Sequence, residues 1–261
     1  MTERALPESG SHAEHVVRCT TAGLGFSSGS SGTVGSERAE LSDGVPDRTA
    51  VRREVVTSLG GAIRELAEAF VGSEVPEEVL ASAAESVRAV TDQLGAVQRA
   101  VDEPAVVDDP AGRIRVFNPV TGLASPLAPP MLLDPRSSDS SCCVGRAVLG
   151  LAYEGPLTYA HGGVIAALLD DILGRVASSV ARPVVTSKLN VRYRAPVPLR
   201  VPLLITGSTE AVAGRHLTLR GTVECESEPG VVLAEAEGRF VVLDARQACA
   251  LFGPSDLDEI A

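Results

Sequence analysis

The segment from His161 to Val180 constrains the fold most strongly, because it predicts a long helix with two different faces. At about 100° per residue, one broad apolar stripe consists of Ile165, Leu168, Leu169, Ile172 and Val176. The opposite face carries small residues around one acid, namely Gly163, Ala166, Ala167, Asp170, Gly174, Ala177 and Ser178. The stripe predicts packing on a sheet, and the small face predicts close approach by a second helix.

The start of this helix has the composition of an anion-binding site. Gly162 and Gly163 follow His161 and let backbone N–H groups approach a ligand closely. The unpaired N–H groups of a first helical turn point at such a ligand, with the positive end of the helix dipole behind them. We therefore expect a developing oxyanion to bind here, although a histidine before two glycines is also typical of a plain polar cap.

Asp170 is a candidate catalytic acid that cannot reach its own helix start. Nine residues separate it from His161, which corresponds to about 13 Å of rise and puts the two side chains about half a turn out of phase. Two copies of the helix packed antiparallel through their small faces would bring Asp170 of one chain near Gly162 of the other. The pattern predicts a shared site in a dimer. An acid among alanines also fits a solvated helix face, and Asp171, at the border of the stripe, is a weaker candidate.

Segments with a period of two follow the helix. Between Val184 and Arg194, apolar residues alternate with polar ones, which is typical of a half-buried strand. Three more strands are predicted at 201–212, 217–226 and 231–243, joined by turns at AGR and SEPG. With a strand at 142–152 before the helix, this order predicts an α+β fold in which an antiparallel sheet wraps one long helix.

The rest of the chain divides into less regular parts. Residues 1–50 contain runs such as SSGSSGTVGS and few large apolar side chains, so we expect a disordered tail. Residues 51–101 predict a helical hairpin that packs on the main domain or mediates assembly, with apolar stripes on Val55, Leu59, Ile63, Leu66 and Phe70 and on Val79, Ala83, Val87, Val90, Leu94 and Val97. A loop-rich connection over 102–141, a main domain over 142–245 and a C-terminal tail over 246–261 complete the organisation.

Composition excludes several classes of function. The net charge of −11, with no basic stripe among aromatic residues, argues against a nucleic-acid partner. No run approaches the roughly 18 apolar residues of a membrane span. Five cysteines without pairing or metal-ligand spacing, and no apolar segment near the N-terminus, favour the reducing cytoplasm. The scattered histidines His12, His15, His161 and His216 indicate no metal cluster.

An anionic ligand would need local positive charge in so acidic a chain. Lys188 is the chain's one lysine and shares a predicted strand face with Arg192 and Arg194. These residues, Asn190 on the same face, and Gly163 are candidate substrate contacts. Arg215 and Arg220 are the alternative contacts for the phosphates of the ligand. A merely solvated strand face is the other interpretation.

The residues from about 146 to 243 resemble the hotdog fold, and specifically acyl-CoA thioesterases of the phenylacetate-pathway type and the thioesterase-superfamily-member proteins. The resemblance rests on YEGPLTYAHGGVIAALLDD, on Thr186 before SKLNVRYRAPVPL, and on the closing strands. An acid nine residues after the histidine of HGG, followed by a strand of the form LNxxYxxPxPL, is far more specific than HGG alone. Nothing in the first 100 residues matches this family.

The resemblance implies a role for each matching residue. Gly162 N–H would help to polarise a thioester carbonyl and His161 would border the site. Asp170 would act as general base or nucleophile, and Thr186 would position the water or the acid. The implied reaction is hydrolysis of acyl-CoA to free acid and CoA, without a cofactor, in a homodimer or a dimer of dimers.

Two other functions stay open from the sequence. A hotdog hydratase or dehydratase would also bind acyl thioesters, but such enzymes usually pair a catalytic histidine with an acid, and here the nearby histidine is part of HGG. A non-catalytic acyl-thioester-binding protein is the second alternative. The presence of both Asp170 and Thr186 favours an enzyme over a binding protein.

Overall fold

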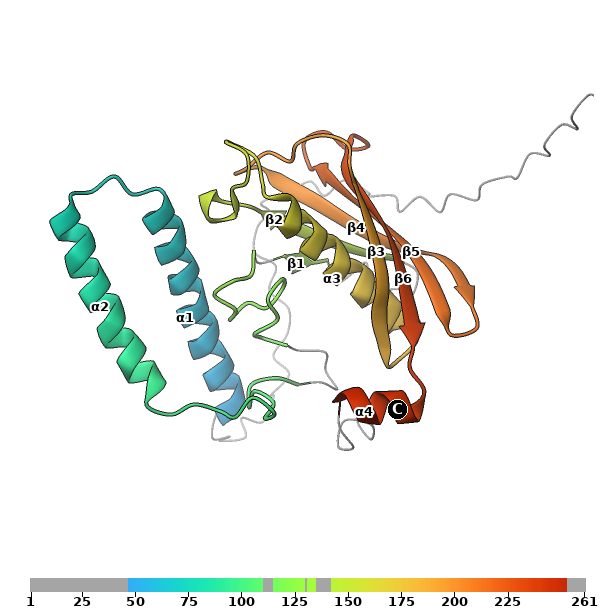
Figure 1. Cartoon of the computed structure of the whole chain (residues 1–261), viewed down its shortest axis with the longest axis horizontal. Helices are drawn as coiled ribbons and strands as arrows, with labels where there is room; N and C mark the ends of the chain where they lie inside the picture. Colours follow the sequence, from blue (N-terminus) through green and yellow to red (C-terminus); the bar gives the residue numbers. More distant parts are fainter. Residues whose placement is uncertain (1–46, 110–114, 130, 135–141, 253–261) are drawn as a thin grey trace, which may run out of the picture. The chain divides into compact units, whose positions relative to one another are not determined.

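An antiparallel six-stranded sheet wraps around the long helix α3 (Gly162–Val180) in the computed structural model (Figure 1). The structure describes residues 47–109, 115–129, 131–134 and 142–252. The strand order is β1-β2-β4-β5-β6-β3, in which β3 forms one edge of the sheet. The strands are β1 (Leu132–Leu133), β2 (Cys142–Val148), β3 (Val184–Tyr193), β4 (Pro202–Ala213), β5 (His216–Cys225) and β6 (Val232–Val242). This arrangement confirms the predicted α+β architecture.

The core lies between α3 and the concave face of the sheet. All five residues of the predicted apolar stripe are at most 1% exposed. The sheet approaches the helix closely at glycines: a Cβ at Gly221 would lie 3.1 Å from Cδ2 of Leu169, and one at Gly207 would lie 3.3 Å from Cγ2 of Val176. The apolar stripe therefore predicted correctly which side of α3 packs on the sheet.

The small face of α3 is more covered within one chain than the sequence predicts. Ala177, assigned to the side open to a second helix, is fully buried, and Gly174 faces the ring of Phe240 on β6. The reason is the curl of the sheet, which brings β3 and β6 around the helix. Ala166 and Ala167, nearer the helix start, remain partly exposed.

Two helices, α1 (Arg48–Val71) and α2 (Glu77–Gly95), precede the sheet. The Asp47 carboxylate accepts a hydrogen bond from the Thr49 N–H at the start of α1. Pro76 precedes α2, and Glu77 and Glu78 lie in its first turn, where their charges favour the helix dipole. The helix α1 starts inside the expected tail over residues 1–50, of which residues 1–46 lie outside the described residues.

Polar contacts attach α1 to other segments. Arg53 Nε donates to the Val107 carbonyl at 2.6 Å, and Arg64 donates to the Ser125 carbonyl at 2.6 Å. Glu68 accepts hydrogen bonds from two successive backbone N–H groups, at 3.0 Å each, in the 3-10 turn η2 (Leu151–Tyr153). These N–H groups, of Leu151 first and Ala152 second, outweigh the effect of burial and lower the pKa of Glu68, with help from Arg200.

The end of the described chain contains a helix that the sequence analysis missed. Helix α4 (Ala245–Phe252) begins at the last residue of the expected main domain and runs into the segment expected to be a tail. The Asp244 carboxylate accepts from the Gln247 N–H, and the Gln247 side chain accepts from the Asp244 N–H. This reciprocal pair is a capping box, so its D-x-x-Q spacing was a readable signal. Within the described ranges, none of the helices combines the length and apolar content needed to cross a bilayer.

Candidate active site

The loop before α3 is held by its own backbone. The Gly155 N–H donates to the Tyr159 carbonyl, and the His161 N–H donates to the Tyr153 carbonyl, both at 2.9 Å. A Cβ at Gly155 would lie 2.8 Å from Cα of His161, so a side chain does not fit there. The loop thus closes tightly beneath His161 and fixes its position at the helix start.

His161 caps α3 and leaves one N–H group open beside it. Its Nδ1 accepts a hydrogen bond from the Gly163 N–H at 3.0 Å, so the ring proton of the neutral imidazole resides on Nε2. Within the described part of the chain, the Gly162 N–H has no hydrogen-bond acceptor. The first turn of α3 therefore offers a free donor with the helix dipole behind it, as predicted for an anion site.

Tyr193 at the end of β3 supports this helix start. Its hydroxyl donates to the Gly162 carbonyl at 2.7 Å. A Cβ at Gly162 would lie 3.2 Å from Cζ of the tyrosine, so glycine lets the ring pack against the turn. From the sequence Tyr193 is expected only as a strand residue, and its place in the LNxxYxxPxPL pattern is the signal for this further contact.

Asp170 and Thr186, both predicted for the site, meet in the structure. Asp170 is partly buried in the middle of α3, and the Thr186 hydroxyl donates to its Oδ1 at 3.0 Å. A hydroxyl that donates to one carboxylate oxygen orients the acid. Thr186 and Asp170 therefore form one polar unit between α3 and the edge strand.

A β-bulge aims Thr186 at the helix. Thr186 pairs with Phe240 and Lys188 pairs with Arg239, so Ser187 is one extra residue in β3. Directly opposed residues share a face, and Phe240 is 1% exposed in the core beside α3. Without the bulge, the period of two would place Thr186 on the same face as Lys188, away from Asp170.

The predicted basic patch consequently lies on the other face of β3. Lys188 and Asn190 are exposed and opposite Arg239 and Glu237 of β6, and Arg192 is opposite Glu235. Arg194, just beyond the strand, forms an ion pair with Glu235 at 2.7 Å. The alternatives Arg215 and Arg220 pair with Asp244 at 3.1 Å and with Glu210 at 3.6 Å. One chain does not bring Lys188, Asn190 or Arg192 next to its own Asp170.

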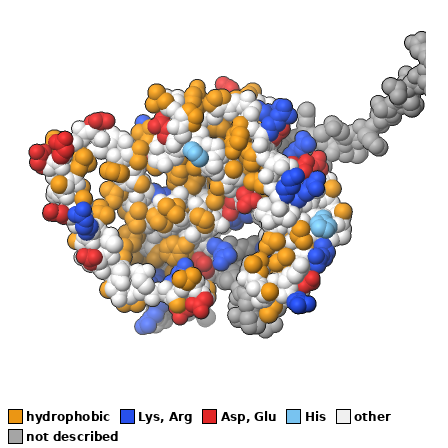
Figure 2. Space-filling model, in the orientation of Figure 1, with side chains coloured by type: hydrophobic (Ala, Val, Ile, Leu, Met, Phe, Trp, Pro, Cys, Tyr) orange, Lys and Arg blue, Asp and Glu red, His pale blue; other side chains and the backbone are white. Residues whose placement is uncertain are grey.

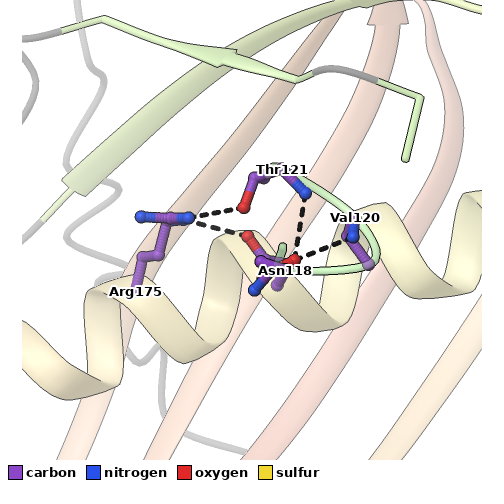
Figure 3. A network of polar contacts seen from close by, with 5 residues as sticks. Asn118, Val120, Thr121 and Arg175 are labelled. Atoms are coloured by element: carbon purple, nitrogen blue, oxygen red, sulfur yellow. Dashed lines mark hydrogen bonds and ion pairs between the residues drawn. The ribbon is translucent and has the colours of Figure 1, made fainter. Parts of the chain in front are cut away.

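Asp171 is engaged in a separate polar network, whose members Asn118, Val120, Thr121 and Arg175 are labelled in Figure 3. It accepts hydrogen bonds from Asn118 Nδ2 at 3.0 Å and from Arg175 Nε at 2.9 Å. Arg175 also donates to the Thr121 hydroxyl, and the Asn118 side-chain oxygen accepts two backbone N–H groups of its own turn. The Asp171 carboxylate thus fastens the 118–121 turn to α3, which leaves Asp170 as the acid of the doublet next to Thr186.

Most of this network has no signal in the sequence. The Asp171–Arg175 spacing of four residues is a readable helical pair. Asn118 lies 53 residues from Asp171, and nothing in the sequence connects them. Among the described residues, no group of three or more histidine, cysteine or acidic side chains is arranged to hold a metal ion.

Comparisons with known proteins match the part of the chain that contains Gly162, Asp170 and Thr186. A family model described as the thioesterase superfamily matches residues 157–232. Acyl-coenzyme A thioesterase THEM4 of Mus musculus is 30% identical over 95 residues, and that of Xenopus laevis is 37% identical over 90 residues. These matches cover 36% and 34% of this chain and 40% of each relative, so the chain spans well under half the length of the curated relatives it matches.

A solved structure extends the likeness. The crystal structure of a thioesterase superfamily protein is 31% identical, with a TM-score of 0.63, and the match covers 71% of this chain and 94% of that chain. This share is larger than residues 101–261, so the likeness includes part of the first 100 residues, where the sequence analysis found no match. The chain therefore belongs to the thioesterase superfamily, and the sheet wrapped around α3 is a hotdog fold.

Proposed function

We propose that this chain hydrolyses acyl-CoA thioesters to a free acid and CoA, at a site shared between two copies. One observation carries the proposal: α3 has an open N–H donor at Gly162 and a Thr186-oriented acid at Asp170. A thioester carbonyl needs an electrophilic clamp and an activated attacker, and these two features supply them. The names of the THEM4 relatives agree with this reaction class.

The clamp is the first turn of α3. The Gly162 N–H and the helix dipole would bind the carbonyl oxygen and stabilise the negative charge that develops on it. Loss of one such donor typically lowers the rate by about 100-fold or more. The exposed His161 borders this donor, and its hydrogen bond to Gly163 keeps the turn in place.

Asp170 supplies the attack by one of two routes. It takes a proton from a water molecule whose oxygen bonds to the carbonyl carbon, or its own carboxylate forms an anhydride that water then hydrolyses. In both routes the carbon–sulfur bond breaks, and the CoA thiolate leaves and takes up a proton. The Thr186 hydroxyl holds the carboxylate in the attacking orientation.

Two copies are needed to complete this site. Gly162 and Asp170 are eight residues apart on one helix, about 12 Å, so a carbonyl bound at Gly162 is beyond the reach of Asp170 in the same chain. A second copy placed against the partly exposed Gly163 and Ala166 would bring its own Asp170 to that carbonyl. We therefore propose a homodimer, or a dimer of dimers, as the active form.

The basic side chains of the edge strand β3 are proposed to bind the anionic carrier, CoA. Lys188 and Arg192 are exposed, and neither forms an ion pair with the described residues. They are proposed to meet the phosphates of CoA together with Arg194 and Asn190. We place the reaction in the cytoplasm, which the cysteine pattern favours.

The doublet Asp170–Asp171 provides a matched test. Asp170→Asn is nearly isosteric and removes the attacking group, so kcat should fall by at least about 100-fold. Asp171→Asn, the control, should change kcat little, because Asp171 contacts the 118–121 turn. A panel of acyl-CoAs with detection of the released thiol measures both. Equal turnover in Asp170→Asn and the parent would overturn the mechanism.

The shared site has its own test. Gly162→Pro removes the N–H donor at a position where helices accept proline, and His161 already has the extended backbone (φ −64°, ψ 131°) that precedes proline. The new Cβ lies 3.2 Å from Cζ of Tyr193, so the ring must shift by a few tenths of an ångström. Each variant alone should be nearly inactive. Refolding Asp170→Asn together with Gly162→Pro should restore about a quarter of parental activity, because half of the dimers are mixed and contain one intact site. No recovery would place the complete site within one chain.

The same assay separates the other functions. A hydratase or dehydratase would alter the acyl chain without releasing thiol. A binding protein would bind acyl-CoA without turnover. Either result in the parental chain contradicts the proposed hydrolysis.

A further inference from the structure

Helix α1 turns polar side chains toward the segments that it contacts. Arg64 and Glu68 are partly buried and bind groups of other segments, and Val56 packs against a small apolar cluster. Most large apolar side chains of α1 are exposed, and Figure 2 shows hydrophobic side chains gathered on the side that carries α1 and α2. The contacts of Arg64 and Glu68 lead from α1 to the loop before His161.

Glu68 caps the 3-10 turn η2 from outside. Gly150, at the N-cap position of η2, has no side chain that could accept the first N–H groups of the turn. Oε1 of Glu68 accepts the Leu151 N–H and Oε2 accepts the Ala152 N–H, at 3.0 Å each. The three atoms nearest to a Cβ at Gly150 would all belong to the Glu68 carboxyl group. A glycine at this position therefore lets α1 reach η2.

Tyr153, the last residue of η2, connects this cap to the active-site helix. Its carbonyl accepts the His161 N–H at 2.9 Å, one residue after the Ala152 N–H that Glu68 binds. His161 is the N-cap of α3, directly before the open N–H donor at Gly162. The place of the Tyr153 carbonyl thus helps to set where α3 begins.

Arg64 reaches the same tyrosine by a second route. It donates to the carbonyls of Leu123 and Ser125, at 2.9 and 2.6 Å. The Tyr153 hydroxyl donates to the Leu127 carbonyl, two residues further along this segment, at 3.4 Å. Two side chains of α1, about one turn apart, therefore hold the segments that contact both the backbone and the ring of Tyr153.

The loop between η2 and α3 has a strained backbone. Among the described residues, Thr158 (φ 71°) and Arg200 (φ 60°) are the ones other than glycine with positive φ. Such a conformation costs energy and persists only where surrounding contacts impose it. The two residues lie on paired loops, because the Leu199 N–H donates to the Thr158 carbonyl at 3.1 Å. Arg200 also donates to Oε1 of Glu68 at 3.1 Å, so this carboxylate contacts both loops.

We propose that Glu68 is a positioning residue of the active site, which acts through η2 and Tyr153 on His161 and the open Gly162 donor. The proposal rests on the proposed function, in which this donor binds the thioester carbonyl. Residues 157–232 match the family model, so Glu68 acts on the site from outside that match. An oxyanion donor must be placed to within about 0.5 Å, and a loop that is strained and capped from another helix does not keep such geometry by its own sequence.

Removal of the carboxylate tests the proposal in the full-length chain. Glu68→Ala should lower kcat about fivefold and change KM less than about twofold, because the donor acts on the charge of the transition state. Glu68→Gln keeps an oxygen that accepts one N–H and should stay within about twofold of the parent. Glu65→Ala is the matched control, since Glu65 is exposed three residues earlier on α1.

All variants are assayed well below their unfolding midpoints, so a purely structural role of Glu68 would leave kcat unchanged. Equal kcat values for Glu68→Ala and Glu65→Ala would overturn the proposal.

Gly150→Ala displaces the carboxylate without removing it. Gly150 has φ −90° and ψ −170°, an extended backbone that alanine adopts readily, and the added methyl group meets the Glu68 carboxyl first. The single variant should lose as much kcat as Glu68→Ala. In the Glu68→Ala background the same change should have no further effect, because the space is then empty. Additive losses would contradict the route from Glu68 through η2.

Hydrogen exchange of the His161 N–H gives a readout that needs no turnover. Its protection should fall in Glu68→Ala and stay parental in Glu65→Ala, because its acceptor is the Tyr153 carbonyl. This difference in a parental chain that releases no thiol supports the route from α1 and contradicts only the proposed hydrolysis. Unchanged protection and unchanged kcat in Glu68→Ala, when the parent does release thiol, contradict only the positioning role.

Discussion

The helices α3 and α1 carry similar apolar stripes, yet the chain uses them in opposite ways. The stripe of α3 is at most 1% exposed under the sheet, whereas four of the five residues of the predicted stripe of α1, namely Val55, Leu59, Leu66 and Phe70, are between 36 and 67% exposed. Helix α1 is held by the polar contacts of Arg53, Arg64 and Glu68 and by Val56, which packs against the small cluster of Val107, Val116 and Ala124. An apolar stripe thus predicts an amphipathic helix, and it does not predict whether the same chain buries that face.

The first prediction measures this difference in stability. Leu169→Ala empties a site that is 0% exposed on α3 and should lower the free energy of unfolding by about 2–5 kcal/mol. The matched change Leu94→Ala, at a residue of α2 that is 47% exposed, should cost less than about 0.5 kcal/mol at dilution. Urea unfolding followed by circular dichroism compares them. Similar losses would mean that α2 already packs within its own chain.

The second prediction concerns the hydrogen bond from the Thr186 hydroxyl to Asp170 of α3. Thr186→Ala removes the donor to Asp170 and should lower kcat about tenfold, or about 1.4 kcal/mol, whereas Thr186→Ser should stay within about threefold. Both variants should unfold like the parent, because Thr186 is exposed. Equal kcat values for the Ala and Ser variants would show that Thr186 has a packing role in β3 and does not orient Asp170.

Sequence patterns predicted the parts of this molecule in which neighbours along the chain decide the outcome. The helix from Gly162 to Val180, its buried stripe and the four strands after it follow from periods of 3.6 and two. The capping role of His161 and the open donor at Gly162 follow from local helix chemistry. The pairing of Asp170 with Thr186 was expected only from the family resemblance.

Features that depend on distant contacts could not be predicted. The bulge at Ser187 breaks the period of two, and no residue type there indicates it. The sequence therefore predicts that Thr186 and Lys188 lie on the same face of the strand. The attachment of Asn118 to Asp171 joins segments 53 residues apart. The sequence does not decide whether the apolar stripe of α1 packs on the main domain or mediates assembly, because amphipathicity alone does not identify the partner.

The third prediction concerns the support of the helix start by β3. Tyr193→Phe keeps the ring against Gly162 and removes the hydrogen bond to its carbonyl, a contact of about 0.5–1.5 kcal/mol at most. Turnover should fall by about threefold through kcat, with KM and thermal stability nearly unchanged. A change in KM alone would indicate that Tyr193 contacts substrate and does not position the Gly162 donor.

The smallest effect is expected where α1 docks on η2, and it depends on pH. The folded chain lowers the pKa of Glu68, first through the Leu151 N–H, so ionised Glu68 stabilises the docked helix above its ordinary pKa. That contribution is lost as pH falls through the lowered value. Because Glu68 lies near the surface, it amounts to less than about 1 kcal/mol. Hydrogen-exchange protection of the Leu151 and Ala152 N–H groups should therefore fall on acidification in the parent and change less in Glu68→Gln. Residues of α3 such as Leu169, seated by apolar contacts, should keep their protection over the same range. If acidification lowers the protection of the Leu151 and Ala152 N–H groups no more than that of α3, the Glu68 contact does not hold α1 on η2.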